Sequence, residues 1–216
     1  VLSAWIDGLG KIEIGKEKKI KDALIKLLPD LDWINNPVLG NTLTSQLTDI
    51  KNAKRVNEHY YIRLTPGVGS PEFENENAYS SMKYPDAGFR LLTLYRYWNI
   101  IQYFFPYKNL IEENWNDVLE EFIPKIIDVK NETDYVLTVL ELIGRVHDTH
   151  ANIWGGNQVL NNYFGLNYAP VEITFIESKP VVTGYYDEKS GKETSLEIGD
   201  IISVINNKPV EEIIKK

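Results

Sequence analysis

The sequence predicts an α+β protein in three parts: a mixed α/β region at residues 1–85, a helical domain at 86–160 and a β-rich module at 161–216. Apolar residues recur at helical spacing through the middle of the chain, whereas the last part alternates short β-branched runs with turn residues. A stretch rich in Ser, Asn, Glu and Pro at residues 68–86 separates the first part from the second.

The N-terminal region mixes short elements. Apolar residues on one helical face predict a helix over residues 18–28, and Pro29 ends it. A weaker apolar repeat predicts a second helix over residues 43–50. Residues 59–64 form a strand candidate that closes at Pro66. Nothing in this region indicates a binding or catalytic site.

The middle of the chain predicts three amphipathic helices joined by short connections. Asp86 is the expected cap of the first helix, which Pro106 ends, and Thr133 is the expected cap of the third. Pro124 is expected to kink the second helix. The aromatic residues at 89–107 sit at helical spacing, so we expect them to pack a core rather than bind a ligand. The apolar stripes are Leu91, Leu94, Tyr95, Trp98, Ile101 and Phe105; Trp115, Val118, Leu119, Phe122, Ile123 and Ile126; and Tyr135, Val136, Val139, Leu140, Ile143 and Val146.

Composition narrows the classes of partner and cofactor. The net charge of −8 argues against binding to nucleic acid or to an anionic membrane. The absence of cysteine excludes disulfides, thiolate metal sites and a cysteine nucleophile within these residues. No apolar run approaches the ~20 residues that span a bilayer. We expect no cofactor, and composition leaves the oligomeric state open.

The β-rich end carries a recognisable order of turns and strands. Two strands are expected at residues 171–176 and 180–183, joined at residues 177–179. A Gly199-Asp200 turn then precedes a β-branched run at 201–205, expected to form a strand buried on both faces, and an Asn206-Asn207 turn follows. This order favours a PDZ-like peptide-binding module. We expect this module to be truncated in the chain. Any small β-rich domain is the alternative.

The chain contains only three histidines, and residues 147–150 hold two of them. His147 and His150 could share a helix face and bind a metal, with Asp148 as a carboxylate ligand. Alternatively, packing or interaction with a helix C-terminus explains them. If the segment is extended, Asp148 is expected to point away from His150. His59 has no evident partner in sequence.

A family resemblance bears on the choice between these alternatives. Several segments of the chain look like serine peptidases of the family that contains C-terminal processing peptidases and the tricorn core protease. The segments are residues 90–92, 95–108, 115, 122–125 and 148–151, followed by the PDZ-like end. The resemblance implies that His150 is the general base for a serine nucleophile, a role that suits an imidazole. It implies that Thr149 replaces a serine whose hydroxyl helps to orient the base.

The same resemblance implies that these residues form the N-terminal portion of a serine endopeptidase. In that family the nucleophile, the oxyanion hole and the last acid lie in an α/β domain after the PDZ module, so we expect no peptide hydrolysis by this chain alone. The resemblance also implies an extracytoplasmic location.

The PDZ-like module is expected to recognise the chain ends of a peptide or protein substrate. Its candidate carboxylate-binding loop is Phe164, Gly165 and Leu166, because Gly beside apolar residues lets backbone amides converge. An ordinary glycine turn explains these residues equally well.

Two other functions fit the sequence. One is a non-catalytic protein that uses the same architecture for peptide binding or scaffolding. The other is a metal-dependent enzyme centred on His147 and His150.

Overall fold

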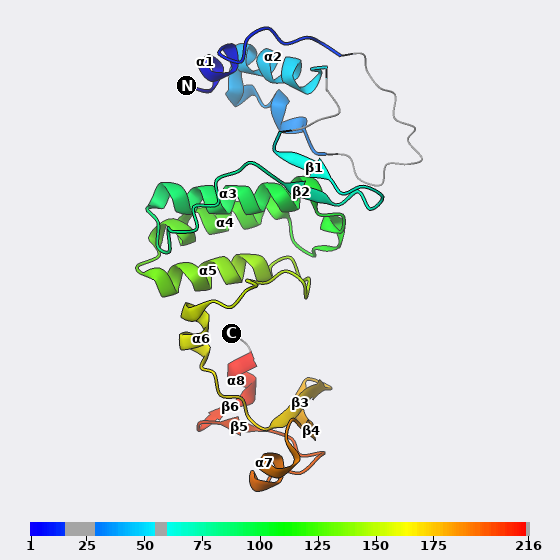
Figure 1. Ribbon diagram of the computed structural model, residues 1–216, viewed down its shortest axis with the longest axis vertical. Helices are drawn as coiled ribbons and strands as arrows, with labels where there is room; N and C mark the ends of the chain where they lie inside the picture. Colours follow the sequence, from blue (N-terminus) through cyan, green and yellow to red (C-terminus); the bar gives the residue numbers. More distant parts are fainter. Residues whose placement is uncertain (16–28, 55–59, 215–216) are drawn as a thin grey trace. The chain divides into compact units, whose positions relative to one another are not determined.

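The computed structural model of the chain describes residues 1–15, 29–54 and 60–214 (Figure 1). The chain divides into two compact units, residues 1–160 and residues 161–216. Of the described residues, 46% are helical and 13% lie in strands, which confirms the mixed α+β class. Every strand named in this part of the chain belongs to a two-stranded antiparallel sheet, so helices form most of the framework. The helix expected over residues 18–28, and His59, lie outside the described residues.

The first unit begins with short elements. They are α1 (Leu2–Asp7), the 3-10 turns Asp32–Asn35 and Pro37–Leu39, α2 (Gly40–Lys51), β1 (Ile62–Leu64) and β2 (Pro71–Phe73). The helix α2 confirms the weak apolar repeat. The strand β2 corrects the expectation that residues 68–86 form only a loop. It forms because the Thr65 amide donates to the Ser70 carbonyl (2.9 Å), which closes a tight turn and returns the chain beside β1.

Three longer helices follow and pack side by side (Figure 1). They are α3 (Ala87–Phe104), α4 (Trp115–Asp128) and α5 (Glu132–Gly144), with a 3-10 turn at Lys108–Leu110. The Asp86 carboxylate accepts hydrogen bonds from the amides of Gly88 and Phe89, which confirms the expected cap of α3. Phe105 is extended, as a residue before proline requires, so α3 ends as predicted.

The start of α5 differs from the expectation. The side chain of Asn131, not that of Thr133, accepts a hydrogen bond from the Asp134 amide (2.9 Å). Thr133 already lies inside the first helical turn, where its side chain cannot reach a free amide ahead of it. The helix α4 continues through Pro124 to Asp128.

The core of the first unit lies between these three helices. Leu94, Val118, Phe122, Ile126 and Leu142 are each fully buried there. At the edge of the core, the indole N–H of Trp98 donates to the Trp115 carbonyl (2.7 Å), and the indole N–H of Trp115 donates to the Trp98 carbonyl (3.0 Å). This reciprocal pair ties the middle of α3 to the start of α4. The aromatic residues of α3 therefore serve packing, as predicted, with Tyr95 an exposed exception.

Arg90 is a buried cation that fixes the end of α4 against α3. Its Nε and Nη2 donate to the carbonyls of Ile126 (2.9 Å) and Ile127 (2.7 Å), and its Nη1 donates to the Pro85 carbonyl (2.8 Å). The last carbonyls of a helix have no partner within the helix. Arg90 therefore satisfies the C-terminus of α4 from a neighbouring helix.

Replacing Arg90 by methionine is expected to lower the free energy of unfolding by about 2 kcal/mol. The change keeps the apolar stem but leaves the Ile126 and Ile127 carbonyls without their charged donor. Urea denaturation followed by circular dichroism measures the loss. The matched control is Arg63→Met, which removes an exposed ion pair and should cost under ~1 kcal/mol. Equal effects of the two substitutions would contradict the role of Arg90.

The second unit is built on one hairpin. Its elements are β3 (Val171–Ile176), β4 (Lys179–Tyr185), α7 (Glu188–Glu193), β5 (Val204–Ile205), β6 (Lys208–Pro209) and α8 (Val210–Ile214). Glu177 and Ser178 both have positive φ, at 50° and 62°, so the hairpin turn has two residues rather than the three expected. Asn206 and Asn207 form a second such turn, as predicted, between β5 and β6.

The β-branched run at residues 201–205 does not form a strand buried on both faces. Ile201 makes a single bridge to Val181, and only Val204–Ile205 is a strand. The side chains of Ile201, Val204 and Ile205 are exposed within the second unit. Small two-stranded sheets cannot cover both faces of such a run. The prediction of burial from its apolar composition was therefore wrong.

Candidate functional site

The segment after α5 forms a turn. The Ala151 amide donates to the Asp148 carbonyl (3.0 Å), and the His150 amide donates to Oδ1 of Asp148 (2.8 Å). A short carboxylate that accepts an amide two residues on is a typical turn-forming arrangement for aspartate. The segment is therefore not extended. Asp148 was expected to point away from His150 only in an extended segment, so that expectation does not apply.

This turn brings the Asp148 carboxylate and the His150 imidazole together. Nδ1 of His150 lies 3.2 Å from Oδ1 of Asp148. The His150 side chain is 93% exposed, so its Nε2 is accessible. The His150 amide, and after it the His150 ring, hold the pKa of the Asp148 carboxyl below its ordinary value. Asp148 is thus an ionised partner that can orient the imidazole from the Nδ1 side.

Thr149 lies between these two residues but does not share their contact. It is exposed, and the described part of the chain offers its hydroxyl no hydrogen-bond partner. Its expected role in orienting His150 stays a prediction. The contact of Asp148 with His150 was not expected from the sequence, although aspartate at the start of a turn was a usable signal.

An apolar groove of about 290 Å³ lies beside the Asp148–His150 pair. One wall is formed by α3 and the residue that follows it, and the other by the end of α5. The turn that carries Asp148 and His150 closes one side. The lining residues are Tyr97, Ile101, Phe105, Ile143, Val146, Asp148, His150, Ala151 and Asn152. Among the described residues that line it, none is a serine, threonine or cysteine. The groove offers an imidazole, a carboxylate and an apolar surface, but no nucleophile.

Tyr97 shows how dry the inner wall of the groove is. Burial raises the pKa of its phenol to about 12, and the negative charge of Asp148 acts in the same direction. The Tyr97 hydroxyl lies 3.5 Å from the Ile143 carbonyl, to which it donates. The phenol is therefore held neutral, and it contributes its ring to the groove.

His147 belongs to a different set of contacts. Its Nε2 lies 3.7 Å from Oε1 of Glu113, a carboxylate that Arg145 also binds. Hydrogen bonds from Arg145 are the largest cause of the lowered pKa of Glu113. The turn therefore directs His147 and His150 to separate carboxylates. Within residues 1–15, 29–54 and 60–214, no three side chains of metal-binding type lie close enough together to hold an ion.

The candidate carboxylate-binding loop lies at the end of α6 (Gln158–Phe164). Gly165 has a φ of +83°, and its amide donates to the Asn161 carbonyl (2.9 Å). Phe164 and Leu166 are both exposed. The Gly165 amide is thus bonded within the turn that ends the helix. This geometry is that of the ordinary glycine turn given above as the alternative. Recognition of a chain end by these residues stays a prediction.

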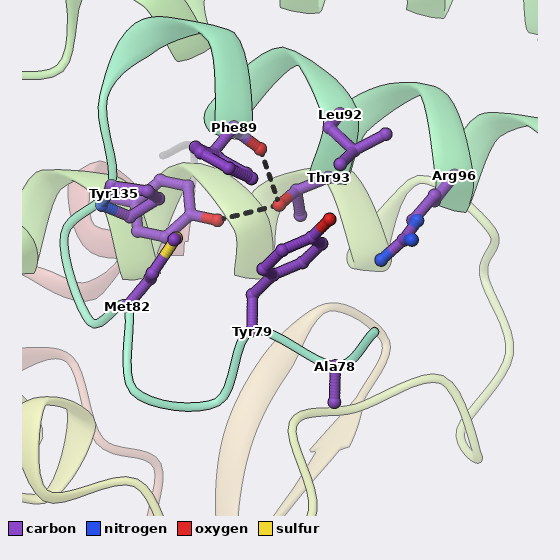
Figure 2. Close-up of a pocket in the computed structure, with 9 residues that line it drawn as sticks. Ala78, Tyr79, Met82, Phe89, Leu92, Thr93, Arg96 and Tyr135 are labelled. Carbon is purple, nitrogen blue, oxygen red and sulfur yellow. Dashed lines mark hydrogen bonds between the residues drawn. The ribbon is translucent and has the colours of Figure 1, made fainter. Parts of the chain in front are cut away.

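A separate, smaller cavity lies beside the first half of α3 (Figure 2). It measures about 120 Å³ and lies under the segment that carries Tyr79 and Met82. The Tyr135 hydroxyl donates to Thr93, whose hydroxyl donates to the Phe89 carbonyl (Figure 2). The lining of this cavity shares no residue with the groove beside His150. Figure 2 shows the Tyr135, Thr93 and Phe89 groups paired in a chain, while Arg96 binds Glu76 and the Asn77 carbonyl outside the drawn set.

No known protein family, curated protein or solved structure matches the chain. None of the helices described here is both long and apolar enough to cross a membrane. The local geometry of the Asp148–His150 turn and its groove is therefore the basis for a functional proposal.

Proposed function

We propose that this chain carries the general base of a serine-type endopeptidase, with His150 as the base and Asp148 as its orienting partner. The observation that carries the proposal is the 3.2 Å approach of Asp148 Oδ1 to His150 Nδ1, which leaves Nε2 accessible. A base held by a third group through its other nitrogen is the arrangement that activates a serine nucleophile. The adjacent groove supports a peptide substrate, because its walls are apolar.

Each residue then has a defined part in the reaction. Nε2 of His150 takes the proton of the serine hydroxyl as its oxygen attacks the peptide carbonyl carbon. It returns that proton to the amine as the peptide C–N bond breaks, which leaves an acyl-enzyme that water hydrolyses. Asp148 stays ionised throughout, because its lowered pKa favours the carboxylate. The family resemblance places the serine and the oxyanion hole in a later α/β domain.

We also propose that residues 161–216 belong to a PDZ-like module that binds substrate chain ends. The order of elements supports this: Gly199 has a φ of +103°, and the segment after it pairs with β4. The Val182 amide donates to the Asp200 carbonyl (2.9 Å), and the Ile202 amide donates to the Pro180 carbonyl (2.9 Å). These bonds occupy the outer edge of β4, so in the described β3–β4 sheet the edge left for a peptide is that of β3. In PDZ-type recognition a peptide adds a strand to an exposed sheet edge.

The proposed activity is tested on the complete product of the gene that encodes these residues. The purified protein is incubated with a mixed peptide library and, separately, with a fluorophosphonate probe that labels activated serines. We expect peptide cleavage and labelling of one serine, and no cleavage by residues 1–216 expressed alone. A complete product that neither cleaves peptides nor takes up the probe would contradict the proposal.

A non-catalytic peptide-binding role is the second candidate. It is favoured by the lack of serine, threonine and cysteine among the described residues that line the groove. The same experiment separates the candidates, because a binding protein would retain peptides without cleaving them.

A further inference from the structure

We propose that the groove beside His150 selects substrates with a large apolar side chain next to the scissile bond, and that Ala151 sets the depth of the groove. This inference rests on the proposed function, since it treats His150 as the base. The observation behind it is that His150 and Asp148 line the same cavity as an apolar stripe on α3. A substrate that approaches His150 from the groove side would lie over these apolar residues.

The size of the groove suits a side chain of the leucine or phenylalanine class. An apolar protein cavity of about 150 Å³ can bind benzene. The groove of about 290 Å³ exceeds that volume, and Tyr97, Ile101 and Phe105 give it an apolar wall. It therefore has room for one branched or aromatic side chain, whereas alanine would leave it largely empty.

The charged residue at the groove disfavours an acidic side chain, and most of the remaining lining is apolar. Asp148 is the only carboxylate among the described lining residues, and it already accepts from the His150 amide and lies beside the His150 ring. Its negative charge therefore disfavours an acidic substrate residue, and both of its contacts with His150 use Oδ1. Lysine and arginine do not occur among the described lining residues either. An uncharged apolar side chain is the occupant that this lining fits.

Ala151 has the smallest side chain of the described residues that line the groove. It is partly buried, packs against the helical core and adjoins His150 in the turn. A larger side chain at this position would occupy the space beside the imidazole. The groove walls on α3 and α5 would remain as they are.

The test compares kcat/KM of the complete gene product for two peptide series, with leucine or phenylalanine and with alanine at each position around the cleaved bond. The wild-type protein should prefer the large residues at one position. Ala151→Leu should lower kcat/KM for those substrates about 10-fold to 100-fold, which is the usual penalty for lost apolar fit. Alanine substrates should change less than about 3-fold. Ala151→Val, a smaller step, should give an intermediate effect and guards against misfolding of the leucine variant.

The control is Ala78→Leu, which enlarges an exposed alanine at the separate cavity of Figure 2 and should leave both series unchanged. If the wild-type protein cleaves no peptide, the proposed function fails. If cleavage depends on His150 but shows no preference for large residues, the function stands and this inference is wrong. Equal losses for both series in Ala151→Leu and Ala151→Val would also overturn it, because a covering segment of the protein, not substrate, would then fill the groove.

Discussion

Replacing His150 by alanine is expected to lower kcat/KM for peptide hydrolysis by the complete gene product about 10³-fold. Without the imidazole, no group at the turn can take the proton of an attacking serine. Asp148 cannot replace it, because a carboxylate with a lowered pKa is a poor base at neutral pH. The loss should fall mainly on kcat, because His150 acts in the transition state, while the walls of the groove are unchanged.

His147→Ala is the matched control for this substitution. His147 is the same residue type three positions earlier, is also exposed, and faces Glu113 rather than Asp148. It should retain activity within about 3-fold of the wild-type protein. If both substitutions cost the same, the assignment of the base to His150 is wrong.

The second large effect is on stability. Phe122→Ala is expected to lower the free energy of unfolding of the helical core by about 3–5 kcal/mol. Phe122 is fully buried between the three long helices, so the substitution removes a ring that the surroundings cannot replace. Lys125 and Arg145 also place cations over this ring, at 4.8 and 5.8 Å from its centre, and would lose that contact. Denaturant unfolding followed by far-ultraviolet circular dichroism measures the change.

Leu110→Ala serves as the comparison. Leu110 lies in the connection between α3 and α4 and is 67% exposed, so its loss should change stability by less than about 0.5 kcal/mol. A cost below about 1 kcal/mol for Phe122→Ala would show that the core is not centred on this ring.

The three long helices were predictable because each carries its own signal, whereas the short helices α1, α6, α7 and α8 were not expected. The apolar stripes of α3, α4 and α5 repeat at helical spacing, and Asp86 and Pro106 delimit α3. Errors arose where two local signals compete within a few residues, as with Asn131 and Thr133 at the start of α5. The short strand β2 depends on its pairing with β1, a contact that no single segment reveals.

The site was predictable only in part. The family resemblance singled out His150, but its partner depends on a turn that places Asp148 Oδ1 under both the amide and the ring of His150. The groove unites residues about 50 positions apart in sequence, from Tyr97 to Ala151. Periodicity assigned Tyr97 and Phe105 only to packing, since it carries no information on which faces of two helices meet.

The central claim is that Asp148 holds His150 with its proton on Nδ1 and leaves Nε2 as the base. Two-dimensional ¹⁵N–¹H NMR of the histidine-labelled protein, at a pH where the imidazole is neutral, reports which ring nitrogen carries the proton. We predict the Nδ1–H form for His150 in the wild-type protein and its loss in Asp148→Ala. An Nε2–H form in the wild-type protein, or the same form in both proteins, would contradict the claim.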